Sequence, residues 1–578
     1  MAFIEVKHLK YRYPHTKALA LDDISFTAEK GEIIGIAGAN KAGKSTLCCA
    51  LAGLVPSLFK GAYGGSVTID GKDAASTPVS TLCRTVGLVF QNPFNQLSGA
   101  AETVFEEAAF GLQNLSIPKE EIEQRVTENL ALLDLLPYKD RNPFDLSGGQ
   151  VQRVALASIL AMQPEVLLLD EPASQLDPQG AAEVFHAVKK LAKRGISIFL
   201  VEQKPDRLAS LCQRLLLLKN GRLLASDTPK KLFSEKLCED AGLEAPFCTT
   251  VCKAFGIRDD DGFYPANMKE TAARKASFPK EQSDAACEDT NSASIFVSEK
   301  NKALQAAAKH APLFQLSGLC FSYTPKVPVL SGLDLELDAR PTAIVGQNGA
   351  GKTTLVKLLK GLLKPTGGKL LFRSEDLSQK TVASLAGQIG YVFQNPDDQI
   401  FKNEVLKEAM FGPINIGLSK EDAKQRALSA LSRMGLSASA GENPYDLDLA
   451  ERKRLAVASV LAMEPEVLIL DEPTIGQDLY GRKQLGEMIQ ARAQEGKAVY
   501  AVLHDMDFAA AYFSRIIVMA HGKVLADGKP ADVFYEMEAL KKARLEQPQA
   551  AQLASQLGYK GRYLTFADFA KLQPSAAI

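Results

Sequence analysis

Short apolar runs alternate along the chain with stretches that repeat apolar positions at helical spacing. Residues 166–169 (VLLL) are all apolar, which predicts a strand buried on both faces. The residues before this strand, from 148 to about 162, predict a helix with one apolar face made of Val151, Val154, Ala155, Ser158 and Ile159. Residues 3–36 predict strands separated by turns. Helices and buried strands in this alternation indicate the α/β class.

Residues suited to nucleotide chemistry lie at the ends of this helix and strand. The helix begins at residues 147–150 (SGGQ), where two glycines leave backbone N–H groups open to an anion at the positive helix end. The strand ends in Asp170 and Glu171, which fit a Mg²⁺ ligand beside a catalytic base. Either half alone is compatible with an ordinary helix or a solvated acidic turn. The two in this order favour a nucleotide site.

A phosphate-binding loop lies upstream. The predicted strand 33–36 runs into residues 38–45 (GANKAGKS), which fit GxxxxGK[ST], and a helix follows. In such a loop the backbone amides cradle the phosphates, Lys44 reaches the β and γ oxygens, and Ser45 binds Mg²⁺. The same pattern recurs at residues 346–353 (GQNGAGKT), again after a short predicted strand, 342–345.

The recurrence extends over most of the chain. VFQNP stands at 89–93 and at 392–396, and VLLLDEP at 166–172 matches VLILDEP at 467–473. The nearly constant offset between these pairs indicates a duplicated domain. We therefore predict nucleotide-binding domains at 1–235 and 312–533, a small appendix after each at 236–272 and 534–578, and a linker at 273–311 that is poor in large apolar residues.

Composition and the distribution of apolar residues argue against several classes of function. The chain has 578 residues, 46% of them hydrophobic, and a formal net charge of −1, which gives no indication of nucleic-acid binding. Its nine cysteines are scattered without zinc-like pairing, which predicts reduced, mostly buried cytosolic thiols. The N-terminus is unlike a signal peptide, and no apolar run approaches the roughly 20 residues of a membrane span. A membrane role would require a partner.

These motifs resemble the signature, Walker B and Walker A motifs of ATP-binding-cassette (ABC) ATPases. The resemblance implies two tandem P-loop domains, each a RecA-like core with a helical subdomain, that use ATP and Mg²⁺. ABC domains of this kind work as head-to-tail pairs, so the signature of one half would close over ATP held by the other within one chain. The implied ATP-binding residues are Tyr13, Gly38, Ala39, Asn40, Lys41, Ala42, Gly43, Lys44, Ser45, Thr46, Tyr323, Gly346, Gln347, Asn348, Gly349, Ala350, Gly351, Lys352, Thr353, Thr354, Ser147, Gly148, Gly149 and Gln150.

The site on the second half has a complete set of implied residues. Glu472 would activate the attacking water, and His504 stands where the family places its switch histidine. The implied Mg²⁺ ligands are Thr353, Gln394 and Asp471 here, and Ser45, Gln91 and Asp170 on the first half. Tyr13 would stack on adenine; a half-buried strand aromatic is the alternative for this residue.

The site on the first half departs from the pattern. It keeps Glu171, but Gln203 replaces the switch histidine. Its closing signature would be residues 447–451 (LDLAE), in which Asp448 replaces serine and both glycines are lost. Added side chains hinder close backbone approach, and a carboxylate about 4 Å from a phosphate charge costs about 4 kcal/mol at an effective dielectric of 20. We predict that this site binds ATP and hydrolyses it slowly or not at all. Lys41, where the second loop has Gly349, would either face Asp448 or be solvated.

The segment after each VFQNP motif narrows the family further. Residues 394–418 (QNPDDQIFKNEVLKEAMFGPINIGL) and their counterpart from 91 resemble the ATPase component of energy-coupling factor (ECF) transporters, which import vitamins or transition-metal ions. That resemblance implies a transmembrane scaffold protein and a small membrane substrate-binding protein as partners. It also implies a peripheral location on the cytoplasmic face of the membrane, with ATP hydrolysis coupled to transport.

Two other functions remain open. A twin-cassette ABC ATPase acting on ribosomes would keep both signatures and carry a basic helical arm, and the linker here is neither long nor strongly basic. The fused ATPase of a sugar importer would share the mechanism and differ in cargo. A DNA-repair ATPase would need a long coiled coil between its Walker motifs, which the spacing excludes, and an iron–sulfur recycling type would need an N-terminal cysteine cluster.

Overall fold

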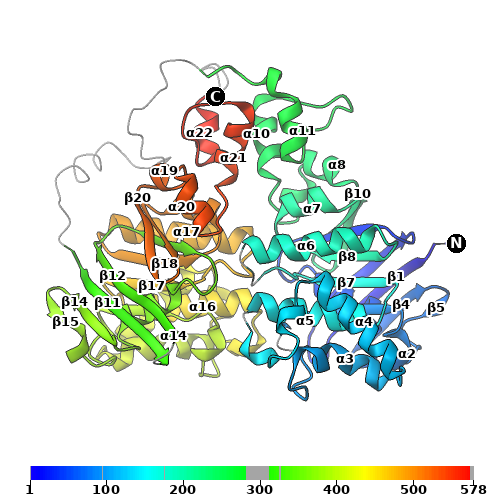
Figure 1. Cartoon of the computed structure of the whole chain (residues 1–578), viewed down its shortest axis with the longest axis horizontal. Helices are drawn as coiled ribbons and strands as arrows, with labels where there is room; N and C mark the ends of the chain where they lie inside the picture. The colour runs from blue at the N-terminus through cyan, green and yellow to red at the C-terminus, as the bar shows by residue number, and fades with distance from the viewer. Residues whose placement is uncertain are drawn as a thin grey trace. The chain divides into compact units, whose positions relative to one another are not determined.

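A computed structural model of the chain describes residues 2–93, 96–146, 148–174, 176, 178–281, 312–324 and 327–572. It divides into two compact units, Met1–Ser277 and Phe278–Ile578 (Figure 1). Both units contain one four-stranded and one six-stranded sheet with the same strand order, so the duplication predicted from the motifs is confirmed at the level of the fold.

The six-stranded sheet of the first unit is parallel except for one edge strand. Its order is β10-β9-β3-β8-β7-β6, and only β10 pairs antiparallel with its neighbour. The strands are β3 (Ile33–Ala37), β6 (Val86–Val89), β7 (Val166–Asp170), β8 (Ser197–Val201), β9 (Arg214–Lys219) and β10 (Arg222–Asp227). An antiparallel sheet, β2-β1-β4-β5, contains β1 (Ile4–Arg12), β2 (Leu21–Ala28), β4 (Ala62–Ile69) and β5 (Lys72–Asp73).

Helices cover these sheets and form a separate layer. Within that layer α3 (Val104–Asn114), α4 (Lys119–Leu132) and α5 (Gly148–Ala161) pack against one another. The core helices are α1 (Lys44–Leu51), α2 (Val79–Leu82), α6 (Pro178–Ala192) and α7 (Pro205–Leu211). The last part of the unit contains α8 (Pro229–Ser234), α9 (Leu237–Asp240), α10 (Phe247–Phe255), α11 (Met268–Ala273) and the 3-10 turn η4 (Lys275–Ser277).

The second unit repeats this arrangement. Its main sheet has the order β16-β17-β18-β13-β19-β20, with β13 (Thr342–Gly346), β16 (Ile389–Val392), β17 (Val467–Asp471), β18 (Ala498–Leu503), β19 (Arg515–Ala520) and β20 (Lys523–Gly528). The antiparallel sheet contains β11 (Phe314–Thr324), β12 (Val327–Leu337), β14 (Gly367–Phe372) and β15 (Glu375–Asp376). Its helices are α13 (Lys352–Lys360), α14 (Val405–Asn415), α15 (Lys420–Arg433), α16 (Leu449–Leu461), α17 (Leu479–Gln494), α18 (Met506–Tyr512), α19 (Pro530–Val533), α20 (Met537–Lys542), α21 (Gln549–Leu557) and α22 (Phe566–Ala570).

The strand predicted at 166–169 is β7, and it is buried on both faces as its apolar run requires. Leu167 and Leu169 belong to the core on the side of the helical layer. Val166 and Leu168 belong to the core on the other side, together with Ile69 of the antiparallel sheet. Two separate cores therefore hold the strand that ends in Asp170.

The predicted helix is α5, but the prediction of a single apolar face was too narrow. Gln152, Leu156 and Ala157 are buried as well, whereas Ser158 and Ile159 are only half-buried. Helix α5 contacts α3, α4, α6 and the strand β6, so neighbours surround most of its circumference. Small residues at 155 and 157 allow that close packing.

The first residues of the predicted linker, 273–281, are described by the structure and pack against other parts of the chain. Residues 273–277 continue α11 into η4, Phe278 is buried, and the Glu281 carboxylate accepts hydrogen bonds from Lys560 N and Gly561 N, both at 2.7 Å. The remainder of the predicted linker lies outside the described residues. The cysteines that the structure describes are free thiols, and most of them are buried. Within the described residues there is no cluster of three or more His, Cys, Asp or Glu side chains that could hold a metal ion.

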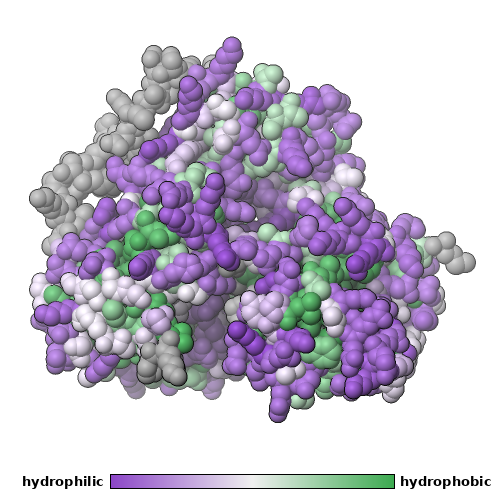
Figure 2. Space-filling model, viewed as in Figure 1, coloured by the Kyte–Doolittle hydropathy of each residue, from purple (hydrophilic) through white to green (hydrophobic). Residues whose placement is uncertain are grey.

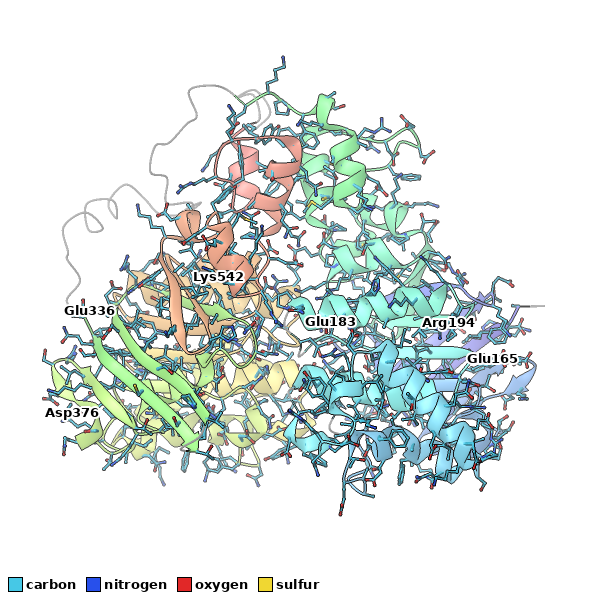
Figure 3. The ribbon with its side chains drawn as sticks, in the orientation of Figure 1. Glu165, Glu183, Arg194, Glu336, Asp376 and Lys542 are labelled. Carbon is cyan, nitrogen blue, oxygen red and sulfur yellow. The ribbon has the colours of Figure 1, made fainter. Side chains whose placement is uncertain are left out.

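The face of the molecule drawn in Figure 2 is predominantly polar, and hydrophobic residues form small patches between the hydrophilic ones. Of the charged residues labelled in Figure 3, Arg194 and Lys542 are exposed, whereas Glu165 is half-buried and pairs with Lys30. Across the described ranges no helix is long and apolar enough to cross a membrane.

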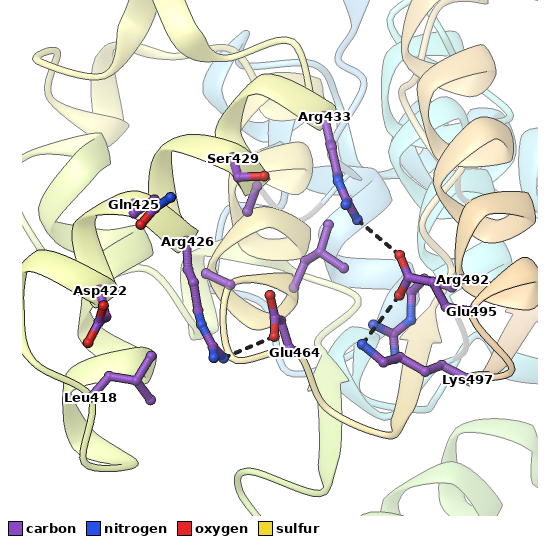
Figure 4. Close-up of a pocket in the computed structure, with 13 residues that line it drawn as sticks. Leu418, Asp422, Gln425, Arg426, Ser429, Arg433, Glu464, Arg492, Glu495 and Lys497 are labelled. Carbon is purple, nitrogen blue, oxygen red and sulfur yellow. Dashed lines mark ion pairs between the residues drawn. The ribbon is translucent and has the colours of Figure 1, made fainter.

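In the second unit a charged pocket of about 580 Å³ is lined by residues of α15, of the end of α16 and of α17 (Figure 4). Its ion pairs are Arg426–Glu464 at 3.1 Å, Arg433–Glu495 at 3.7 Å and Lys497–Glu495 at 3.3 Å. Arg492 also lines the pocket and is 1% exposed, and its Nε has no hydrogen-bond partner. Burial lowers the pKa of Arg492 to about 10. The first unit has Leu132, Leu191 and Ile196 at the positions of Arg433, Arg492 and Lys497, so this charged pocket distinguishes the second unit.

Candidate functional site

Each phosphate loop connects the central strand of its sheet to a helix, as predicted. The first glycine of each loop has a positive φ, +146° at Gly38 and +156° at Gly346. A Cβ at Gly38 would lie 2.2 Å from Leu218 O, and one at Gly346 would lie 2.1 Å from Met519 O. Neighbouring backbone therefore excludes any side chain at these positions, and the loop passes tightly over the end of the next strand.

The loop lysines are held by hydrogen bonds to backbone carbonyls of their own loops. In the second unit, Lys352 Nζ donates to Gly346 O at 2.8 Å and to Gln347 O at 2.9 Å, and Lys44 makes the matching pair of bonds in the first unit. Both lysines are buried. Each ammonium group is therefore held against the backbone of its own loop, and its binding to phosphate oxygens stays a prediction.

Two of the three proposed magnesium ligands of the second unit lie together. Thr353 Oγ1 and Asp471 Oδ1 are 3.2 Å apart. Burial raises the pKa of Asp471, and the charge of Glu472 raises it further. Hydroxyl and carboxylate oxygens are ligands that Mg²⁺ prefers, so the donor set fits that ion. Tyr391 donates to Asp471 Oδ2 at 2.9 Å and was not predicted; Leu88 occupies its position in the first unit.

The carboxylate of Glu472 is held from two sides. Its Oε1 lies 2.7 Å from His504 Nε2, and its Oε2 accepts from Gln394 Nε2 at 2.7 Å. Glu472 has a φ of +52°, a left-handed conformation that is uncommon for residues other than glycine. Burial acts to raise the pKa of Glu472, but the hydrogen bond from His504 and the charges of Lys352 and Lys453 outweigh burial and hold it below its ordinary value. Glu472 is thus maintained as a carboxylate.

The corresponding carboxylate of the first unit has different electrostatics. Glu171 Oε1 accepts from Gln203 Nε2 and its Oε2 accepts from Gln91 Nε2, both at 2.7 Å. Gln203 therefore occupies the place of the histidine and provides a neutral donor. Burial raises the pKa of Glu171 to about 7, more than the positive charge of Lys44 lowers it. At neutral pH Glu171 is only partly ionised, which weakens it as a base.

Comparison with known proteins shows the family of the chain. The sequence profile of the ABC transporter family matches residues 21–174 and 330–475. The chain belongs to the ABC transporter family. A Methanosarcina acetivorans ABC transporter ATP-binding protein is 37% identical over 98% of this chain and 92% of its own length. A Streptococcus pneumoniae ABC transporter ATP-binding protein is 31% identical over 96% of both chains. The two units are therefore ABC cassettes, and the chain is an ABC ATPase.

One similar solved structure is cbiO1 from Clostridium perfringens, described as part of the ABC transporter complex cbiONQ. It is 34% identical in sequence, covers 40% of this chain and 94% of its own, and has a TM-score of 0.37.

The signature of the first ABC cassette opens helix α5. Ser147 lies outside the described residues, and Gly148 and Gly149 form the first turn. A Cβ at Gly148 would have nothing within 4 Å, so packing does not require glycine there. An open backbone at a helix N-terminus is suited to an anion.

The altered signature of the second cassette starts α16 in a different way. The Asp448 carboxylate accepts from Glu451 N at 2.8 Å, and the Glu451 carboxylate accepts from Asp448 N at 3.1 Å. This is a complete capping box, and the spacing Asp-x-x-Glu could have predicted it. Side chains of the same cassette therefore use two of the N–H groups that this helix end would otherwise offer to an anion.

The two tyrosines among the implied ATP-binding residues occupy equivalent places. Tyr13 follows the end of β1, and its hydroxyl lies 3.2 Å from Thr46 Oγ1. Tyr323 is 60% exposed, and its hydroxyl lies 3.3 Å from Thr354 Oγ1. Each ring also packs edge-on against a second aromatic ring of its strand. Both rings therefore stand beside the helix that follows the phosphate loop of the same cassette.

Proposed function

We propose that this ABC ATPase energises an ECF-type importer of a vitamin or a transition-metal ion. The observation that carries the proposal is the segment after each VFQNP motif, whose sequence resembles the ECF ATPase component and which exposes aromatic side chains. A transmembrane scaffold protein and a small membrane substrate-binding protein would be the partners. The chain would then act as a peripheral subunit at the cytoplasmic face of the membrane, and it would not contact the cargo.

The aromatic surface of the second cassette is built on α14 and the loop before it. Phe401 is 55% exposed and Phe411 is 37% exposed, and their rings meet edge to face with centroids 4.6 Å apart. Lys402 Nζ lies 4.5 Å from the centre of the Phe411 ring. The Glu408 carboxylate, which is buried, accepts from the backbone N–H groups of Phe401 and Lys402 and so fixes the loop. Exposed aromatic rings on a fixed loop suit the docking of a partner helix.

The first cassette has a smaller version of this surface. Phe110 and Phe144 are exposed, and Ser98 replaces Phe401. Buried Glu107 holds the loop, because its carboxylate accepts from the N–H and the hydroxyl of Ser98. The two docking surfaces would therefore accept non-identical helices of the scaffold.

We also propose that the two cassettes pair within the chain and that one of the two ATP sites hydrolyses. The hydrolytic site would combine the Walker residues of the second cassette with the signature at 147–150. Lys352 would bind phosphate oxygens, Glu472 would take the proton of the attacking water, and His504 would hold that carboxylate in place. Mg²⁺, when bound, would neutralise phosphate charge beside Thr353 and Asp471.

The other site would bind ATP with slow hydrolysis or none. Three features support this assignment. Glu171 has a raised pKa, Gln203 is neutral where His504 stands in the second cassette, and the helix end expected to close the site is capped by Asp448 and Glu451.

ATP hydrolysis by the complex recovered from membranes tests the proposal. We expect Glu472→Gln to abolish turnover and Glu171→Gln to leave at least half of it. Equal losses from the two substitutions would show that the first site also hydrolyses. Recovery of the chain with a membrane scaffold and a small hydrophobic protein is expected. Recovery on ribosomes would overturn the importer assignment, and stimulation of turnover by a sugar would contradict the proposed cargo.

A further inference from the structure

Lys453 is a buried lysine of α16 that no motif of the sequence identified. Its side chain is 6% exposed, and its Nζ donates to the backbone carbonyl of Glu472 at 3.1 Å. Helix α16 begins at the altered signature, so the residues after that signature reach the strand end that carries the proposed base.

The matching contact of the first cassette differs. Gln152 stands at the position of Lys453 and is also buried, but its Nε2 has no hydrogen-bond partner. The amide N–H is anchored equally in both cassettes, since Glu171 N donates to Val201 O at 3.0 Å and Glu472 N donates to Val502 O at 3.1 Å. The two glutamates differ on their carbonyl side, because Glu171 O accepts from Ser174 N at 3.1 Å and Glu472 O accepts from the charged Lys453 Nζ.

Anchoring this peptide matters because the backbone of Glu472 is strained. A φ of +52° is sparsely populated by residues with a side chain and persists only when surrounding contacts hold it. A hydrogen bond from a buried ammonium group to the carbonyl is charge-assisted and stronger than a neutral one. The bond from Lys453 thus opposes rotation of the peptide that directs the Glu472 side chain toward His504 and Gln394.

We propose that Lys453 is a positioning residue for ATP hydrolysis, which fixes the backbone of Glu472 so that its carboxylate stays aligned for attack by water. The proposal rests on the assignment of hydrolysis to Glu472. It adds a further difference between the cassettes, because the first cassette has glutamine at this place. Lys453 touches neither the substrate nor the reacting atoms in this role.

The test compares steady-state ATP hydrolysis by the full-length chain and three variants. Lys453→Gln installs the residue of the first cassette, and Lys453→Met removes the donor with little change in length. Lys360→Ala is the matched control, because Lys360 is also buried and donates to a backbone carbonyl, that of Ile389 at 2.6 Å, away from Glu472. The first cassette has Ala52 at that position.

We expect both Lys453 variants to lower kcat about five- to tenfold, the effect of losing one charge-assisted hydrogen bond, with KM for ATP within about twofold of wild type. Lys360→Ala should leave kcat unchanged. Thermal unfolding of each variant separates misfolding from misalignment. A Lys453 variant whose kcat stays within about twofold of wild type would overturn the proposal. The proposal would also fail if Lys360→Ala lowered kcat as much as the Lys453 variants while losing the same amount of Tm.

Glu472→Gln, measured alongside, separates this inference from the proposed function. If Glu472→Gln retains turnover, the assignment of hydrolysis to Glu472 fails. If Glu472→Gln abolishes turnover and both Lys453 variants remain active, the assignment stands and the positioning role of Lys453 is wrong.

Discussion

Glu171 and Glu472 occupy equivalent positions, yet they should affect stability with different pH dependence. Burial raises the pKa of Glu171 from an ordinary value of 4.5 to about 7. Between these two values the folded chain binds more protons at this group than the unfolded chain, so the free energy of unfolding falls as pH rises. We therefore expect Glu171→Gln, which cannot ionise, to become more stable relative to wild type as pH increases.

The size of the effect follows from the same two values. The difference corresponds to about 3 kcal/mol once pH exceeds the folded pKa, since each tenfold change in proton affinity is worth about 1.4 kcal/mol. For a unit of this size, about 3 kcal/mol raises Tm by roughly 6 °C. Differential scanning calorimetry of the full chain without nucleotide or Mg²⁺ measures it, and the chain has no tryptophan to serve as a fluorescent probe.

Glu472→Gln is the matched control. The pKa of Glu472 lies below its ordinary value, so its ionised form stabilises the folded state above the ordinary pKa, and that stability is lost as pH falls through the folded pKa. From about pH 5.5 to about pH 7 the gain of Glu171→Gln should grow, and above about pH 7 it should stay constant. Over the same range the control should lose stability by a constant amount. Parallel curves for the two variants would refute the electrostatic difference between the sites.

Two further predictions concern residues outside the nucleotide sites. Arg492→Leu installs the residue of the first cassette. It should leave the free energy of unfolding unchanged or raise it, because an apolar side chain replaces a buried guanidinium with an unpartnered Nε. A loss above about 2 kcal/mol in urea unfolding would contradict this. Glu408→Ala should free the loop that carries Phe401 and weaken recovery of the membrane complex at least about fivefold, with ATP hydrolysis by the isolated chain unchanged, since two charge-assisted hydrogen bonds are lost.

The sequence predicts the parts of the fold and site whose chemistry is local. The predicted strand 166–169 agrees with β7 to within one residue, because a short run of apolar residues is stable only when it is buried on both faces. The phosphate loops could be located because glycine, lysine and a hydroxyl residue at this fixed spacing are typical of phosphate binding. The roles of Glu472 and His504 followed from the family resemblance, whereas the 2.7 Å contact between their side chains was not predicted.

Contacts between residues distant in sequence were not predictable in this way. Tyr391 reaches Asp471 from the neighbouring strand, and Lys453 reaches Glu472 from α16, and neither residue type signals such a contact by itself. The burial of α5 on most sides depends on helices elsewhere in the chain. The capping box of Asp448 and Glu451 is different, because the spacing Asp-x-x-Glu at the start of a helix is visible in the sequence and is sufficient to predict it.

The difference between the cassettes lies in the contacts around one peptide rather than in the fold. The strand order and the conformation of the Walker B glutamate are the same in both, with φ of +49° at Glu171 and +52° at Glu472. Around that shared backbone, Gln203 donates to the Glu171 carboxylate where His504 contacts Glu472. Lys453 donates to the carbonyl of Glu472, whereas Gln152 at its position has no partner for its Nε2, and the carbonyl of Glu171 accepts from Ser174 N. At both positions the first cassette has a neutral residue where the second has an ionisable one. A positive charge that is absent from two sides of Glu171 leaves burial as the dominant influence on its pKa, which is the direction found.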